Sequence, residues 1–264
     1  MPYKTWGSLL SYLTIFFVTL IFGCASLTPL PPAKHFSRKD TTHLISHLRE
    51  QEEKIFSFQG VGRLRFKEGE EESEANLFAV GCRPFKIRIE ITHPWGRPLF
   101  HIVADERNIS ALSLVDNKFF KGPSSPLNTK QFFLFGLDLD SAWKILSGSV
   151  PILPHCRTVS LKSHEITLFN RQGEVVEIIS FSPKTFLPRS VCFPKEGFTM
   201  LLSKFKEGDL GSHPLRIKII KEDKDQLLEI RYKNLKLNKP VSEEIFRLNP
   251  PADFEIIKLN HHEN

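Results

Sequence analysis

Cysteine, tyrosine and tryptophan are all scarce in this sequence, whose 264 residues include 4 Cys, 3 Tyr and 3 Trp. None of the cysteines forms a CxxC pair, so the ligand spacing of a zinc site and the motif of a thioredoxin-like redox site are both missing. The sequence also lacks a GxSxG motif, an HExxH motif and a complete dinucleotide-binding glycine loop. These absences argue against an enzyme, and we expect neither a metal nor another cofactor.

Charge is nearly balanced, with 36 Lys+Arg against 30 Asp+Glu and a formal net charge of +6. The excess of basic residues is spread along the chain, which argues against a nucleic-acid partner. An apolar content of 41% and a charged content of 25% are typical of a folded domain. Phenylalanine is abundant at 23 residues, and it buries a large area without a polar group. The surplus indicates a thick core or an apolar cavity.

The first 33 residues carry a single charge, on Lys4, and contain the apolar run Leu13–Phe22, which ends at Gly23 and Cys24. A basic start, a short apolar run and a small residue before the cleavage point are typical of a secretory signal. An uncleaved transmembrane anchor is the alternative. The uncharged stretch 6–22 is short for that role, because a helix that spans a bilayer needs about 20 residues.

Residues 21–24 (IFGC) resemble the lipobox of bacterial lipoproteins, in which the cysteine becomes the lipidated N-terminus. We therefore expect residues 1–23 to be a signal peptide and Cys24 to carry covalent lipid, which holds a protein firmly on a membrane when several acyl chains are attached. By the sorting rule of proteobacterial lipoproteins, Ala25 after the cysteine implies export to the outer membrane. Residues 24–40 are rich in proline and are expected to form an extended tether.

Apolar periodicity predicts one domain over residues 41–258, followed by a disordered tail at 259–264. Residues 41–55 have the 3.6-residue period of an amphipathic helix, capped by Asp40 or Thr41. The period then changes to 2, which indicates strands. The expected strands are 57–66, 74–82, 85–91, 98–103, 109–114, 157–169, 174–181, 187–193, 197–203, 215–219 and 228–232.

Residues 127–148 interrupt this pattern and predict two short helices, the second capped by Asp140 and ended by Gly148. The order of elements favours an antiparallel sheet with helices on one face. Gly60 and Gly62 indicate an irregularity in the first strand.

Two questions stay open at this point. Cys156 and Cys192 either form a disulfide or are small apolar residues in strands. His43 and His47 have i, i+4 spacing on the first helix, but no third ligand accompanies them, so we expect them to face solvent.

Several stretches resemble the LolB family, outer-membrane lipoproteins that receive other lipoproteins from the periplasmic carrier LolA. They are His43–Leu64, Ile87–Phe119 and Asp138–Pro151. The ending 238–257 (NKPVSEEIFRLNPPADFEII) is similar to the close of LolA-type domains. The resemblance covers most of residues 41–258. It implies an α+β, mainly β fold in which an open half-barrel antiparallel sheet is lidded by helices.

The resemblance further implies a lipid-anchored acceptor in the outer membrane, with its domain facing the periplasm. Such a protein would bind acyl chains of lipoproteins, or related lipids, in an apolar cavity and insert them into the outer membrane. Its partners would be outer-membrane lipid, the acyl chains of its cargo and a periplasmic LolA-like carrier. The alternative is a structural or lipid-sensing lipoprotein with the same fold, because an open cavity and a packed core need the same apolar alternation.

The residues expected to line the cavity come from the sheet and from the helical block. They are Ile87, Ile89, Ile91 and Phe100 on the sheet, and Phe132, Phe133 and Trp143 above it. The alternative is that these side chains pack on one another as an ordinary core.

The segment Pro94–Arg97 is expected to form a tight turn, because Pro94 restricts one backbone angle and Gly96 permits a positive one. In the LolB family the matching turn carries a protruding apolar side chain needed to deliver cargo. The resemblance therefore implies that Trp95 enters the membrane while Arg97 meets phosphate groups. The alternative is that the ring of Trp95 folds back over the edge of the sheet.

Overall fold

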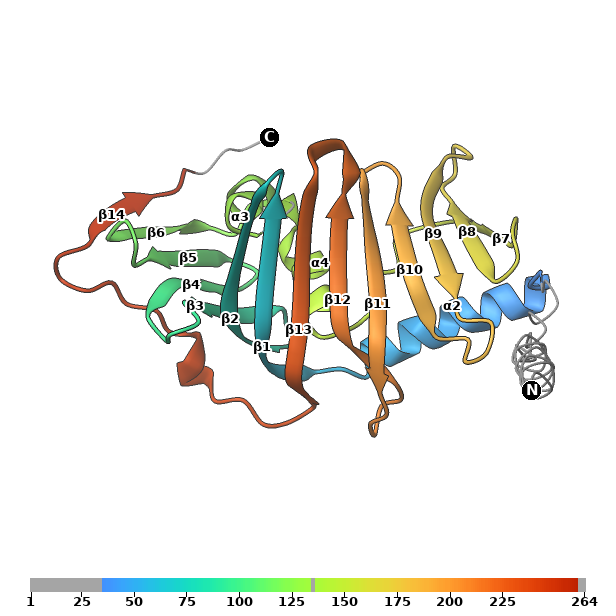
Figure 1. Ribbon diagram of the computed structural model, residues 1–264, viewed down its shortest axis with the longest axis horizontal. Coiled ribbons are helices and arrows are strands. Elements are labelled where there is room, and N and C mark those ends of the chain that lie inside the picture. The colour runs from blue at the N-terminus through green and yellow to red at the C-terminus, as the bar shows by residue number, and fades with distance from the viewer. Residues whose placement is uncertain (1–34, 134–135, 261–264) are drawn as a thin grey trace, which may run out of the picture. The chain divides into compact units, whose positions relative to one another are not determined.

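The computed structural model describes residues 35–133 and 136–260, and these form one mainly β unit (Figure 1). Fourteen strands make a single sheet in the order β14-β6-β5-β4-β3-β2-β1-β13-β12-β11-β10-β9-β8-β7. The outer strands β14 and β7 do not pair with each other, so the sheet is open. Neighbouring strands are antiparallel except β14 and β6, which are parallel. This confirms the predicted fold class.

The helices in the described residues are α2 (Arg38–Glu53), α3 (Pro126–Phe132) and α4 (Leu139–Leu146), with short 3-10 turns η2 (Glu222–Lys224) and η3 (Glu243–Phe246). The strands are β1 (Ser57–Glu68), β2 (Glu71–Cys82), β3 (Lys86–Thr92), β4 (Pro98–Ala104), β5 (Asn108–Ser113), β6 (Lys118–Pro123), β7 (Arg157–Val159), β8 (Glu165–Phe169), β9 (Val175–Phe181), β10 (Pro188–Phe193), β11 (Phe198–Lys206), β12 (His213–Lys221), β13 (Gln226–Leu237) and β14 (Glu255–Lys258).

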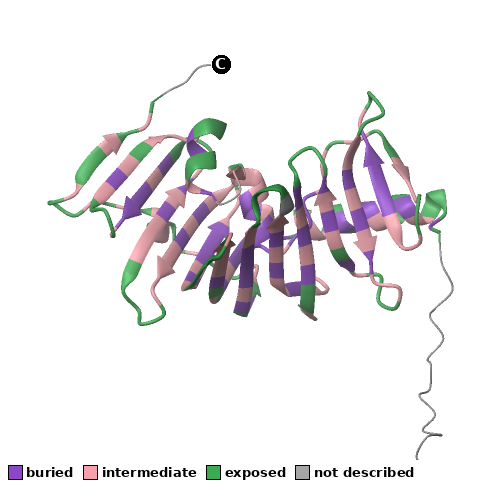
Figure 2. Ribbon diagram, turned by 45° about the horizontal axis from the view of Figure 1, so that its top comes forward, coloured by how far each residue is buried: buried purple, intermediate pink, exposed green. Residues whose placement is uncertain are grey.

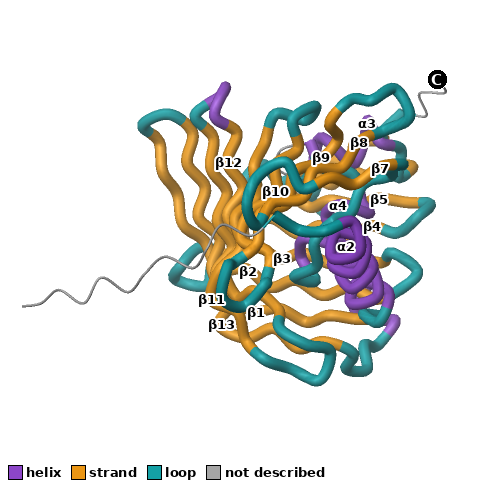
Figure 3. Tube along the Cα trace, turned by 90° about the vertical axis from the view of Figure 1, so that its right-hand side faces the viewer, coloured by secondary structure: helices purple, strands orange, loops and turns teal. Residues whose placement is uncertain are grey.

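The strands bury one face of the sheet, as their alternation predicts. In β3, Ile87 and Ile89 are buried, while Arg88 and Glu90 lie on the opposite face. Figure 2 shows the same alternation of buried and less buried positions along most strands. The helices gather on the apolar side, within the curve of the sheet (Figure 3). We call this side the inner face and the opposite side the outer face.

Helix α2 begins three residues earlier than predicted, so the expected cap at Asp40 or Thr41 is wrong. Ser37 is the N-cap: its side chain accepts a hydrogen bond from the backbone N–H of Asp40. The carboxylate of Asp40 in turn accepts the N–H of Ser37, which completes a capping box. This reciprocal pair leaves fewer unpaired donors at the helix start than a cap at residue 40 would.

The second helix of the block is capped by Asp138 and not by Asp140. The carboxylate of Asp138 accepts the N–H of Ser141 at 2.7 Å. Asp140 instead forms an ion pair with Lys144 at 2.9 Å, one helical turn further on. The predicted stop is confirmed, since α4 ends at Leu146 and Gly148 has φ +80°.

The packed region is longer than predicted at both ends. Phe36 is buried, its N–H donates to Ser160 Oγ, and its ring packs edge-on against Phe181. The expected tail is wrong for its first residues, because Leu259 donates its N–H to the carbonyl of Lys121 and packs against the core. Residues 1–34 and 261–264, including the predicted signal peptide and Cys24, lie outside the described residues.

The expected strand 157–169 is two strands, β7 and β8, and β6 and β14 were not predicted. Strand β6 lacks clear alternation, and β14 is a four-residue edge strand, so neither has a strong local signal. The glycine irregularity is confirmed, since the β1–β13 register shifts between Val61 and Gly62. The possible disulfide is not formed: the described cysteines are all free.

The C-terminal segment crosses the outer face of β3 before it pairs with β6. Lys86 forms an ion pair with Glu243, and the guanidinium of Arg88 donates to the carbonyls of Ile245 and Arg247. Residues far apart in sequence therefore cover the outer face at this end of the sheet. Within residues 35–133 and 136–260, no helix covers the rest of the outer face (Figure 1).

Glu177 on β9 is a fully buried carboxyl in the other half of the sheet. Its Oε2 accepts the N–H of Leu153 at 2.9 Å, and its Oε1 has no hydrogen-bond partner. Burial raises the pKa of Glu177 to about 8, with the hydrogen bond from Leu153 as a smaller, opposing influence. The folded protein therefore holds a proton on Glu177 at a pH at which the unfolded chain has lost it.

We predict that Glu177→Gln stabilises the protein at high pH. The stability that the neutral carboxyl contributes is complete below its ordinary pKa of 4.5 and is lost as the pH rises to about 8. An amide keeps an acceptor for Leu153 and does not ionise. Urea unfolding should show a gain of roughly 2–5 kcal/mol at pH 8.5 that shrinks toward pH 5. The exposed control Glu71→Gln should show no such pH trend, and parallel curves for Glu177→Gln and the native protein would contradict the prediction.

Candidate functional site

An apolar pocket lies between the inner face of the sheet and the helical block. Its volume is about 70 Å³, and every side chain that lines it is apolar. The lining residues are Leu64, Leu77, Ile89, Ile91, Ile102, Phe132, Phe133, Leu137, Ala142, Ile145, Leu146, Ile219, Leu228 and Ile230. They come from α3, α4, the segment between them and strands β1, β2, β3, β4, β12 and β13. A site without a polar group suits hydrocarbon and offers no group for covalent chemistry.

Four of the predicted cavity residues line this pocket. Ile89 and Ile91 lie on its floor in β3, and Phe132 and Phe133 close it from the end of α3. Phe132 also stacks on Phe100, with ring centroids 6.3 Å apart, so Phe100 borders the phenylalanines without lining the pocket itself.

Ile87 and Trp143 lie outside the pocket and are fully buried. The indole of Trp143 packs edge-on against Phe58 and Phe85, and the guanidinium of Arg83 lies 4.6 Å from its ring centroid. Both residues belong to the packed core, which was the alternative interpretation for them.

Several lining residues were not predicted from the sequence. Leu64, Leu77, Ile219 and Leu228 all carry the period-2 signal of their own strands, which is sufficient to place them on the inner face. That signal does not specify which strands meet beneath α4. Only the strand order, which brings β1 and β2 beside β13 and β12, puts these side chains under one helix.

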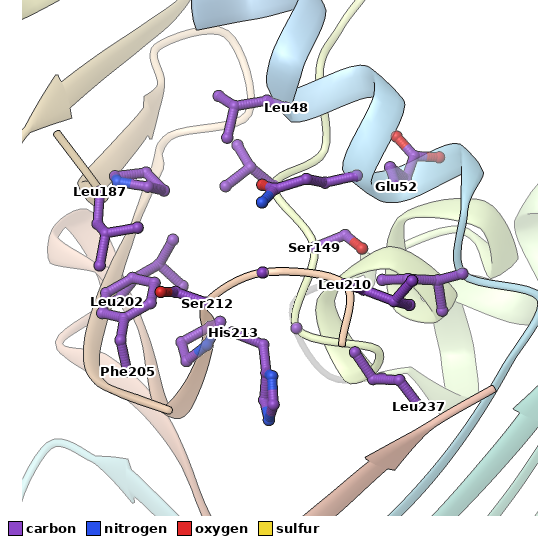
Figure 4. Close-up of a pocket in the computed structure, with 17 residues that line it drawn as sticks. Leu48, Glu52, Ser149, Leu187, Leu202, Phe205, Leu210, Ser212, His213 and Leu237 are labelled. Atoms are coloured by element: carbon purple, nitrogen blue, oxygen red, sulfur yellow. The ribbon is translucent and has the colours of Figure 1, made fainter. Parts of the chain in front are cut away.

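A second, smaller pocket of about 40 Å³ lies where α2 meets β11, β12 and the segment after α4 (Figure 4). Its lining is mixed, with Leu48, Leu202 and Phe205 beside Glu52, Ser149 and His213. Burial lowers the pKa of His213, and the backbone of Gly211 has a smaller, opposing influence. The pocket is too small and too polar to hold a hydrocarbon chain.

The predicted turn between β3 and β4 is present. The carbonyl of His93 accepts the N–H of Gly96 at 2.7 Å, and the N–H of His93 donates to the carbonyl of Arg97. Gly96 has φ +89°. Trp95 is 89% exposed, so its ring does not fold back over the sheet, contrary to the alternative. Trp95 is therefore a large apolar side chain exposed to solvent at the tip of a hairpin.

A second exposed apolar side chain lies at the same end of the sheet. Val115, which is 63% exposed, is in the β5–β6 turn. The antiparallel order β3-β4-β5-β6 places this turn on the same side as the β3–β4 turn, and the N–H of Leu114 donates to the carbonyl of Leu99. Trp95 and Val115 are therefore neighbouring apolar tips.

Within the described part of the chain, no group of three or more His, Cys, Asp or Glu side chains could hold a metal ion. His43 and His47 are exposed, as predicted, and their rings stack 6.4 Å apart. None of the helices described here is both long enough and apolar enough to cross a membrane.

No family model matches the sequence, and no curated protein matches it. Solved structures do share its fold. A putative outer membrane lipoprotein-sorting protein domain from Vibrio parahaemolyticus aligns with a TM-score of 0.53 at 10% identity, over 79% of this chain and 96% of that one. A LolA superfamily protein from Nitrosomonas europaea aligns with a TM-score of 0.50 at 15% identity, over 78% and 97%.

A DUF1329 family protein from Desulfovibrio piger has a TM-score of 0.52 at 8% identity, over 78% of this chain and 97% of that one. These matches establish a LolA/LolB-like fold, which confirms the predicted resemblance at the level of the fold.

We predict that Ala142→Leu blocks the apolar pocket without unfolding the protein. Ala142 lines the pocket from α4, and the larger side chain fills a cavity of about 70 Å³. Binding of a dansyl-labelled fatty acid, followed by fluorescence, should weaken about tenfold or more, while the melting temperature stays the same or rises. Ala252→Leu, in an exposed loop, is the matched control. Unchanged affinity in Ala142→Leu would mean that the probe binds elsewhere.

Proposed function

Because the chain has a LolA/LolB-like fold, we propose that it is a lipid-anchored acceptor of the cell envelope. In this proposal it binds acyl chains of lipoproteins, or related lipids, and inserts them into the outer membrane. The apolar pocket between the sheet and the helical block carries the proposal, since it is lined entirely by apolar side chains. An acyl chain is the ligand class that leaves no buried polar group unpaired in such a pocket.

Transfer in this mechanism needs no bond to form or break. Acyl chains leave one apolar site and enter another, so the hydrocarbon avoids exposure to water, which would cost about 0.8 kcal/mol per methylene. A cavity of about 70 Å³ is smaller than the roughly 150 Å³ that accommodates a benzene ring. Loading therefore requires Phe132 and Phe133 to move away from the sheet.

The aromatic contacts of α3 support such a movement. Phe132 packs on Phe100 and Phe120, which are only partly buried on β4 and β6. These rings extend the apolar wall beyond the pocket, so an acyl chain that displaces Phe132 meets further apolar surface.

Trp95 is proposed to enter the membrane during delivery. Tryptophan favours the membrane interface, where the ring is in an apolar environment and its N–H stays hydrated. Arg97, in the same turn, would meet lipid phosphates with a weak attraction that salt screens. Cargo would arrive from a periplasmic LolA-like carrier.

We predict that Trp95→Glu blocks delivery and leaves loading intact. Trp95 makes few contacts in the fold, so its replacement should change the free energy of unfolding by no more than about 0.5 kcal/mol. Transfer of a bound fluorescent acyl ligand to liposomes should slow about tenfold or more, because it is energetically unfavourable to insert a carboxylate into the bilayer. Trp95→Leu is the control that keeps an apolar tip. Transfer by Trp95→Glu at the native rate would remove the turn from the mechanism.

The anchor is proposed to be diacylated Cys24, at the start of the mature chain. We predict that Cys24→Ala leaves the protein unlipidated, since the thiol is the group that carries the lipid. The variant should either appear in the soluble fraction or keep its uncleaved signal. Mass spectrometry of the native N-terminal peptide should detect acyl groups on Cys24, and an unmodified peptide that begins at residue 24 would contradict the lipoprotein proposal.

The small volume of the pocket favours a second candidate, a non-catalytic structural or assembly lipoprotein of the envelope with the same fold and a closed core. The two candidates differ in whether Phe132 and Phe133 ever leave the sheet. Saturable binding of the dansyl-labelled fatty acid, lost in Ala142→Leu, supports the carrier. The absence of binding to the folded native protein supports the structural module.

A further inference from the structure

A wide groove separates the N-terminal part of α2 from the last strand of the sheet. Its volume is about 670 Å³, and it shares no residue with the apolar pocket. One wall is a face of α2, and the other is the segment 155–160, which includes β7. The hydroxyls of Thr41 and Thr158, which lie 3.4 Å apart, connect the two walls.

The groove is basic. Arg38 and Arg49 line it from α2 and Arg157 lines it from β7, and none of its lining residues is acidic. Within residues 35–133 and 136–260, none of these three arginines forms a salt bridge. Arg49 Nη2 lies 3.3 Å from His155 Nδ1, and the guanidinium of Arg157 lies over the ring of Phe169. Guanidinium groups without a carboxylate partner are suited to bind an anion.

The strand wall of the groove is a free edge. β7 is the terminal strand of the sheet, and among the described residues it pairs with β8 alone. Main-chain groups on its other side therefore have no strand partner within that part of the chain, and such edges accept an extended peptide through main-chain hydrogen bonds. Figure 1 shows β7 at the end of the sheet with the start of α2 close by.

The spacing of the arginines matches an extended chain. Arg38 and Arg49 are about three turns apart on α2, a rise of about 16 Å. Five residues of an extended peptide, at about 3.3 Å each, span the same length. A single phosphate group would reach only one end of the groove. From this match we propose that the groove binds an acidic peptide segment of a partner protein, in an extended conformation that adds to the edge of β7.

The test uses the purified full-length protein and a fluorescein-labelled octapeptide of alternating glutamate and valine. Fluorescence anisotropy at low salt should show saturable binding with a Kd below about 1 mM, weakened more than about tenfold by molar salt. The matched peptide of alternating lysine and valine should not bind. No saturable binding of the acidic peptide at about 1 mM would overturn the proposal.

Charge-reversing variants locate the site. Arg38→Glu and Arg157→Glu should each weaken binding of the acidic peptide about tenfold, since both residues are exposed and line the groove. Arg171→Glu makes the same charge change in the exposed β8–β9 turn and should leave the affinity unchanged. Equal losses of affinity in all three variants would mean that binding depends only on the net charge of the protein, which would overturn the proposed site.

Two further measurements separate strand addition from other modes of binding. Methylation of alternate backbone nitrogens in the peptide should abolish binding, because it removes the main-chain donors. Equal affinity of the methylated peptide would overturn strand addition. Displacement of the peptide by phosphatidylglycerol vesicles, with vesicle binding lost in Arg157→Glu and kept in Arg171→Glu, would identify a lipid headgroup as the occupant and overturn the peptide proposal.

Discussion

The inner face of the sheet is apolar across many strands, and it must be covered without closing the sheet into a barrel. The helices α2, α3 and α4 provide the cover, and α4 has the central position. Trp143 inserts between Phe58 and Phe85, and the hydroxyl of Tyr232 donates to the carbonyl of Leu146 at 2.8 Å. These contacts fix α4 over the middle of the sheet. The apolar surface on either side of α4 is covered by α2 and α3.

Both candidate sites lie where that cover is incomplete. The apolar pocket lies where α3, α4 and the segment between them meet the sheet, and Phe132, Phe133 and Leu137 line it opposite the strands. The basic groove is present because α2 lies beside β7 without filling the space at the sheet edge. The first opening is lined by hydrocarbon and the second by arginine, so the two favour ligands of opposite chemistry.

The outer face is stabilised in a different way. Glu229 is fully buried on β13 between Arg216 and Arg231, and Arg231 also pairs with Glu74 at 2.7 Å. At the other end of the sheet the C-terminal segment crosses β3 and then adds β14 beside β6. Charged pairs and a returning chain thus complete the outer face, and the inner face is left to the helices.

Local patterns in the sequence determined the elements that depend on near neighbours. The alternation of 85–91, the helical block at 127–148 and the Pro94–Arg97 turn need only adjacent residues, and each is present in the structure. The same patterns missed β14, because an edge strand that pairs in parallel is stabilised by a partner distant in sequence. They also placed the N-cap of α2 too far along the chain. Several polar residues near the start of the helix could act as the N-cap, and only the hydrogen bonds of the folded structure distinguish Ser37 from the others.

Only the tertiary structure decided which apolar side chains face the pocket. Alternation places Ile87 and Ile89 on the same face of β3, and both are buried, but Ile89 lines the apolar pocket and Ile87 does not. The groove likewise joins Arg38 to Arg157, residues that no local pattern relates. Periodicity specifies the face on which a side chain lies, whereas burial and proximity depend on what the rest of the chain brings to that face.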